Sequence, residues 1–244
     1  ERSLLSKAMD RWSGEGRETR GPAPSAALNS TGFTSGLRSM ETSHRPLLML
    51  RCKVAVVGDA CVGKTALVEL FHKNKYPKNY QMTSWTSFCV KQVNIKDTSA
   101  AVELYLFDCG GQSVFSATEA NHSLFENTAF VMCVYDVSNK ESFDSVRTWL
   151  SKVRSRRPPN TPPLPGIIVA NKIDLREEDD FMSRAVVTTE QGEALAKAEG
   201  LEFCEVSAAQ QLDHDKPFHY IAEEFHKKYQ ETVRRAELLA QGPL

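Results

Sequence analysis

Residues 58–65, GDACVGKT, have two glycines, a lysine and a threonine at the spacing GxxxxGK[S/T], between an apolar run and a helix-like run. In such a loop, successive backbone N–H groups surround a phosphate, and the next helix adds its partial positive charge. We expect Lys64 to reach the outer phosphates and the Thr65 hydroxyl to bind Mg²⁺. The predicted contacts to the nucleotide are Gly58, Asp59, Ala60, Cys61, Val62, Gly63, Lys64, Thr65 and Ala66.

A second motif, FDCGG at residues 107–111, ends a strand-like run with an aspartate and places a glycine three residues later. Asp108 can hold Mg²⁺ through a water molecule. The backbone N–H of Gly111 can approach a terminal phosphate because no Cβ stands in the way. By itself the pattern also fits an ordinary turn at a strand end. After a phosphate loop it indicates a metal and phosphate contact.

A third motif, NKID at residues 171–174, follows another apolar run and points to guanine. The Asp174 carboxylate can accept hydrogen bonds from N1–H and the exocyclic amine of guanine, whereas adenine has no such pair of donors. Asn171 and Lys172 belong to the same predicted contact. After the last strand-like run, Ser207 and the N–H of Ala208 can reach the guanine carbonyl oxygen.

The composition of the chain indicates its domain size and excludes some classes of partner. The chain has 244 residues, of which 41% are hydrophobic, so it can form one domain of ordinary size with tails. A net charge of -1 and a pI near 6.7 argue against nucleic acid or an anionic membrane as a partner. Six cysteines without metal-ligand spacing indicate small buried side chains in a reducing, cytoplasmic compartment. No apolar run approaches the roughly 20 residues of a membrane-spanning helix.

Strands and helices must alternate to position these motifs. Residues 1–47 are rich in Gly, Ser, Pro and Arg and are predicted to be a disordered extension, residues 48–235 a single domain, and residues 236–244 a tail. Strands are expected at 52–57, 87–95, 101–108, 129–137, 166–171 and 201–207, and helices at 64–73, up to about 125, at 138–153, at 189–199 and at about 215–235. The turn at 96–100 makes the second and third strands antiparallel. The pattern predicts an α/β fold: a six-stranded, mostly parallel sheet with one antiparallel edge strand and helices on both faces.

The motifs GDACVGKT, DCGG, NKID and SA, in this order, resemble those of the Ras superfamily of small GTPases, and VYDVSNKESFDSVRTWL is similar to its Rab branch. The resemblance implies the P-loop GTPase fold, GTP or GDP with Mg²⁺, and GTP hydrolysis. It implies that Thr83 binds Mg²⁺ and the terminal phosphate, that Gln112 orients the attacking water, and that Tyr76 covers guanine. Lys64, Thr83 and Gln112 would then be catalytic, and Ala60 would leave room for an arginine finger.

Some segments depart from the usual Rab pattern and indicate one subfamily. After Thr83 the chain has Ser84 and Trp85 where Rab proteins have Thr-x-Gly, and FDCGGQS replaces their WDTAGQE. With VNIKDTSAAVELYLFDCGG, KPFHYIAEEFHKKY and a chain end without cysteine, the sequence resembles the Rab-like GTPase subunits of intraflagellar transport complex B. That likeness implies a heterodimer with a small β-sandwich subunit, no lipid anchor, a place in the cytoplasm and the cilium or flagellum and its base, and slow hydrolysis without an activating protein. Two alternatives stay open: a Rab-type vesicle-traffic GTPase without a lipid anchor, and a binding module whose GTP is structural.

The last predicted helix has an apolar stripe, which we expect to pack on the sheet as in any such fold. The stripe consists of Phe218, Ile221, Ala222, Phe225 and Tyr229. Leu238 and Leu239 lie further along and would be exposed unless a partner covers them.

Overall fold

A six-stranded sheet forms the centre of the computed structural model, which describes residues 46–77, 83, 86–111, 125–158, 161–176 and 187–240. The strands, in chain order, are β1 Leu48–Val57, β2 Ser87–Asn94, β3 Ala100–Asp108, β4 Phe130–Asp136, β5 Gly166–Asn171 and β6 Glu202–Val206. The proposed disorder of the N-terminal extension and the helix expected to end near residue 125 lie outside the described residues, apart from the ends of these segments.

The order of the strands in the sheet is β2-β3-β1-β4-β5-β6. β1 pairs in parallel with β3 and β4, and the parallel pairing continues through β5 to β6. Among the described strands, only the edge strand β2 is antiparallel to its neighbour, β3, because the two strands form a hairpin whose turn contains Asp97 at a φ of 58°. The predicted fold class is confirmed. The parallel strands all end at one edge of the sheet, which is where ligands bind in such folds.

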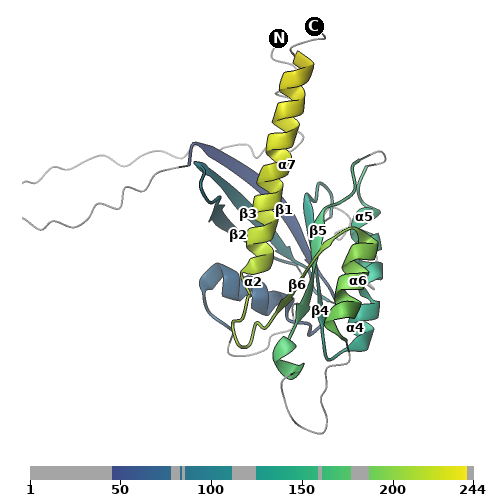
Figure 1. Ribbon diagram of the computed structural model, residues 1–244. Helices are drawn as coiled ribbons and strands as arrows, with labels where there is room; N and C mark the ends of the chain where they lie inside the picture. The colour runs from purple at the N-terminus through teal and green to yellow at the C-terminus, as the bar shows by residue number, and fades with distance from the viewer. Residues whose placement is uncertain are drawn as a thin grey trace, which may run out of the picture.

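Helices cover both faces of the sheet, so two apolar cores form (Figure 1). Alternate β1 residues point to opposite sides: Val54 and Val56 join the core under α2 (Lys64–Lys73) and α7 (Lys216–Ala240). Ala55 and Val57 join the core under α5 (Val146–Arg154) and α6 (Thr189–Glu199). This double burial explains why the central strands are continuous apolar runs.

Two predicted helices differ from those observed. The expected helix at 138–153 consists of α4 (Lys140–Asp144) and α5, and it starts later because the Asn139 side chain accepts a hydrogen bond from the N–H of Ser142 and caps α4. Ser145 joins the two helices in a right-handed helical conformation, with a ψ of -16°. α7 continues to Ala240, past the expected end near 235, because RRAELLA is composed of strong helix formers. Its last turns project beyond the sheet (Figure 1).

The described helices include none with both the length and the apolar character that crossing a membrane requires.

Candidate nucleotide-binding site

The phosphate loop connects β1 to α2 at the carboxyl edge of the sheet, as predicted. Gly63 precedes the helix with a φ of 97°, and a Cβ there would lie 2.2 Å from Nδ2 of Asn171, so only glycine fits. The first turn of α2 contains no acidic residue. The positive end of the helix is therefore available to an anion.

Lys64 lies inside this loop rather than in solvent. Its side chain is 5% exposed, and its ammonium group donates hydrogen bonds to the carbonyl oxygens of Gly58, at 2.8 Å, and Asp59, at 2.7 Å. Burial lowers the pKa of Lys64, and the nearby Asp108 carboxylate opposes that shift. Because a buried cation is favoured by an opposite charge, the loop is electrostatically suited to phosphate.

Three oxygen-bearing side chains meet beside the loop. The Thr65 hydroxyl donates a 2.6 Å hydrogen bond to Oδ2 of Asp108 and lies 2.8 Å from the hydroxyl oxygen of Thr83. Asp108 is 1% exposed, and its buried Oδ1 has no hydrogen-bond partner among the residues that the structure describes. Burial raises the pKa of Asp108, opposed by the Thr65 hydrogen bond and by Lys64. Hard oxygen donors together with an unpaired carboxylate oxygen fit Mg²⁺, so Thr65, Thr83 and Asp108 are the residues that would hold it.

The segment after β3 approaches the phosphate loop at Gly111. A Cβ on Gly111 would lie 2.1 Å from the backbone nitrogen of Ala60, so any other residue would push the two segments apart. Gln112 lies outside the described residues, and its catalytic role stays a prediction. Tyr76, which follows α2, is 40% exposed, and its contact with a base also stays a prediction.

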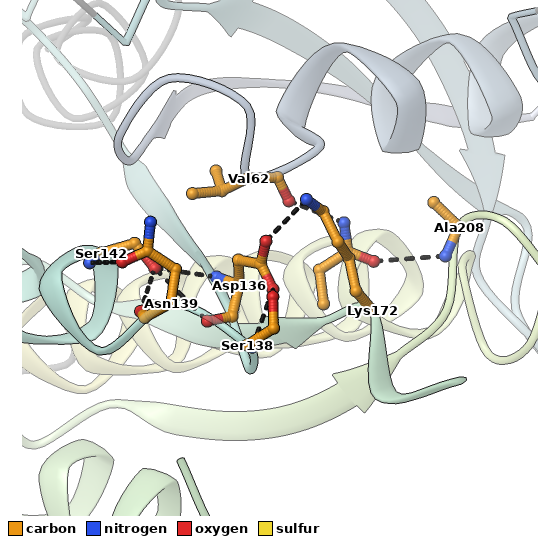
Figure 2. Close-up of polar contacts among 8 residues, drawn as sticks. Val62, Asp136, Ser138, Asn139, Ser142, Lys172 and Ala208 are labelled. Carbon is orange, nitrogen blue, oxygen red and sulfur yellow. Dashed lines mark hydrogen bonds and ion pairs between the residues drawn. The ribbon is translucent and has the colours of Figure 1, made fainter. Parts of the chain in front are cut away.

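The base-recognition residues come together where β5 and β6 end, and Figure 2 shows two of them, Lys172 and Ala208. Asn171 is 1% exposed; its Nδ2 donates to the carbonyl oxygen of Val62 at 2.8 Å, and its Oδ1 accepts from the N–H of Ala208 at 3.2 Å. Asn171 thereby joins the phosphate loop to the loop after β6. The Ser207 hydroxyl donates to Oδ1 of Asp174 at 2.5 Å, which fixes the carboxylate that is expected to meet the base. Asp174 lies in the short helix η1 (Ile173–Arg176).

Two side chains that hydrogen-bond to predicted site residues were not predicted from the sequence. Asp136, at the end of β4, accepts hydrogen bonds from Nζ of Lys172 at 2.6 Å and from the N–H and hydroxyl of Ser138 at 2.8 and 2.7 Å (Figure 2). Its place at the carboxyl end of a parallel strand was the available signal. Trp149, on α5, is buried in the core, and its indole N–H donates to Oδ1 of Asp59 at 2.7 Å.

The strand order, the loop between β1 and α2 and the joined loops after β5 and β6 define the class of P-loop nucleotide-binding proteins with a Ras-like fold. Residues 53–227 match the model of the Ras family, and the chain belongs to this family.

The chain is also similar to intraflagellar transport proteins over most of their length. It is 40% identical to the intraflagellar transport protein 27 homolog of Bos taurus over 189 residues, which cover 77% of this chain and 96% of the relative. It is 38% identical to intraflagellar transport protein 27 of Chlamydomonas reinhardtii over 187 residues, 75% of this chain and 88% of the relative. A Rab relative, the Ras-related protein Rab-1 of Theileria parva, is 31% identical over 171 residues, 70% of this chain and 72% of the relative.

Proposed function

We propose that this chain is a small GTPase of intraflagellar transport, which binds GTP and GDP with Mg²⁺ and hydrolyses GTP slowly. One observation supports nucleotide binding most directly: the base-recognition corner, the meeting point of Asn171, Asp174 and Ser207. There Asn171 donates a hydrogen bond to the phosphate loop, and Ser207 donates one to the Asp174 carboxylate. The names of the intraflagellar transport relatives, which match along most of their length, support the cellular role. We infer a place in the cytoplasm and in the cilium or flagellum and its base.

The side chains present suggest how hydrolysis would proceed. Lys64 would hold the outer phosphates, while Gln112 would orient the attacking water. When bound, Mg²⁺ supplies positive charge that offsets the charge developing on the phosphate oxygens. Neither residues 58–65 nor residues 107–112 contain an arginine that could add to this charge. The unaided rate is therefore expected to be slow, and an activating protein that supplies an arginine would raise it roughly 10³- to 10⁵-fold.

A single-turnover assay tests this proposal. GTP should bind far more tightly than ATP, and Gln112→Leu should lower the rate of hydrolysis while leaving the Kd for GTP within about twofold, because the water-orienting amide does not hold the nucleotide. Equal affinities for GTP and ATP would contradict the proposal. A Gln112→Leu variant as fast as the parent would instead favour the alternative in which GTP is a structural ligand of an assembly subunit.

The end of α7 suggests where a protein partner binds. The buried residues of this helix end at His226, yet the helix continues to Ala240 and exposes 61% of Leu238 and 84% of Leu239. An apolar patch on a projecting helix would be covered where a protein partner binds. From the resemblance described above, we propose that residues 229–239 contribute to a nucleotide-independent heterodimer with a small β-sandwich subunit of complex B.

Truncation after Lys228 should abolish co-purification with that subunit and leave GTP binding intact, because every nucleotide motif precedes it in the chain. A finer variant, Leu238→Ser with Leu239→Ser, should weaken the complex, whereas Gln230→Ser on an exposed position of the same helix should not. Unchanged co-purification of the truncated chain would refute this interface.

A further inference from the structure

Asp59 places a carboxylate inside the loop that is expected to hold phosphate. Its neighbours in the loop are Gly58 and Ala60, and its own carbonyl oxygen accepts a 2.7 Å hydrogen bond from Lys64. A carboxylate free to turn toward a bound phosphate would repel it, because like charges a few ångströms apart at a partly buried site interact strongly. The loop therefore needs a means of keeping this side chain away from the phosphate position.

The backbone and the side chain of Asp59 face different neighbours. The backbone faces Lys64 and Gly111, two residues expected to contact phosphate: the carbonyl oxygen accepts a hydrogen bond from Lys64, and a Cβ on Gly111 would lie 2.4 Å from the Asp59 carbonyl carbon. The side chain reaches the helix layer, where Oδ1 accepts the 2.7 Å hydrogen bond from the indole of Trp149. The two directions separate the carboxylate from the backbone groups expected to bind phosphate.

Trp149 is well suited to fix that arrangement. It is 1% exposed, it lies on α5 within the core that includes Val57 and Leu150, and burial restricts the rotation of its ring. The indole N–H can only donate a hydrogen bond, so it selects an oxygen and holds the acceptor at one place. A hydrogen bond to a carboxylate is stronger than one between neutral groups.

We propose that Trp149 is a positioning residue for nucleotide binding, which holds the Asp59 carboxylate on the helix side of the loop and so keeps its charge away from the phosphates. This inference rests on the proposed guanine-nucleotide binding. If Trp149 only filled the core, its effect would depend neither on the charge at residue 59 nor on the number of phosphates in the ligand.

A double-mutant cycle separates these two roles. The four proteins are the full-length parent, Trp149→Phe, Asp59→Asn and the double variant, and the Kd values for GTP, GDP and GMP are measured in Mg²⁺ after thermal unfolding confirms that each protein is folded. Trp149→Phe should weaken GTP binding about tenfold when residue 59 is aspartate, but less than about twofold when it is asparagine. The loss should decrease from GTP to GDP to GMP, and it should shrink as salt rises from about 50 to about 500 mM.

If Trp149→Phe fails to fold, incorporation of benzothienylalanine at position 149 keeps the bicyclic shape and removes only the N–H donor. The same pattern of Kd values is expected. An equal loss whether residue 59 is aspartate or asparagine, or an equal loss for all three nucleotides, would overturn the positioning role and leave Trp149 as a packing residue. A parent protein that binds no guanine nucleotide would overturn the proposed function, and this inference with it.

Discussion

Replacing Asp174 by asparagine exchanges one carboxylate oxygen of the base-recognition corner for an amide NH₂. The structure fixes this side chain through the Ser207 hydroxyl, which donates to Oδ1 at 2.5 Å. An asparagine oxygen can keep that bond, so the η1 segment should retain its conformation. The perturbation is therefore confined to the charge and to the second oxygen, the two properties expected to recognise guanine.

The expected loss of GTP affinity follows from the groups that change. Asp174→Asn removes the negative charge from two hydrogen bonds to the base and sets an NH₂ group against a donor of guanine. We expect binding to weaken by at least about 1 to 3 kcal/mol, which corresponds to roughly 5- to 150-fold in Kd. Xanthine has a carbonyl oxygen where guanine has its exocyclic amine, so the variant should gain affinity for xanthosine triphosphate.

Equilibrium competition of GTP, xanthosine triphosphate and ATP against a fluorescent guanine nucleotide measures these affinities. Asp97→Asn is a suitable control because it makes the same chemical change in the β2–β3 turn, at the opposite end of β3 from the site. Its φ of 58° is also compatible with asparagine. An Asp174→Asn variant that binds GTP as the parent does would refute the assignment of this carboxylate to the base.

Two further expectations concern stability. Asn171→Ala should lower the free energy of unfolding by about 1 to 3 kcal/mol in urea titrations, because it leaves the buried polar groups of Val62 and Ala208 without their partner, while Asn94→Ala on the exposed edge strand should cost much less. The pKa of Glu199 lies below its ordinary value of 4.5, chiefly because Arg154 donates a hydrogen bond to the carboxylate. The pair therefore stabilises the fold above pH 4.5, and this contribution is lost as the pH falls through the lowered pKa of the folded protein. Glu199→Gln should therefore cost about 1 kcal/mol or less at pH 7 and nothing at about pH 2, and an equal cost at both would contradict this reasoning.

Local signals explain which elements could be predicted from the sequence. The predicted bounds of α6 agree with the structure because Thr188 and Gln191 form a capping box at its start and Gly200 ends it at a φ of 67°. The bounds of β5 also agree with the prediction, since an apolar run between prolines and a polar motif admits few alternatives. The beginning of α4 was wrong because its cap, Asn139, lies inside a run that otherwise continues the helical pattern.

Long-range contacts explain what the sequence could not provide. The motifs placed Lys64, Thr65, Asp108 and Asn171 at the carboxyl edge, and the structure brings them together there. The hydrogen bond between Asp59 and Trp149 joins residues 90 positions apart. Neither residue belongs to a local pattern that predicts the other, so their pairing depends on how α5 packs against the sheet at β4. Sequence motifs identify the groups that touch a ligand more readily than those that hold these groups in place.

The charges of the site indicate why a polyphosphate and a divalent cation would bind together. Lys64 and Asp108 are almost completely buried. Burial lowers the pKa of Lys64 and raises the pKa of Asp108, so it favours the neutral form of each group. Their hydrogen bonds and their attraction to each other compensate only in part, because Lys64 donates to neutral carbonyl oxygens and Oδ1 of Asp108 has no hydrogen-bond partner among the described residues. A phosphate would supply the counter-charge for Lys64, and a cation the counter-charge for Asp108. A phosphate alone would bring a negative charge near Asp108, and a cation alone would bring a positive charge near Lys64, so the site favours the two ligands together.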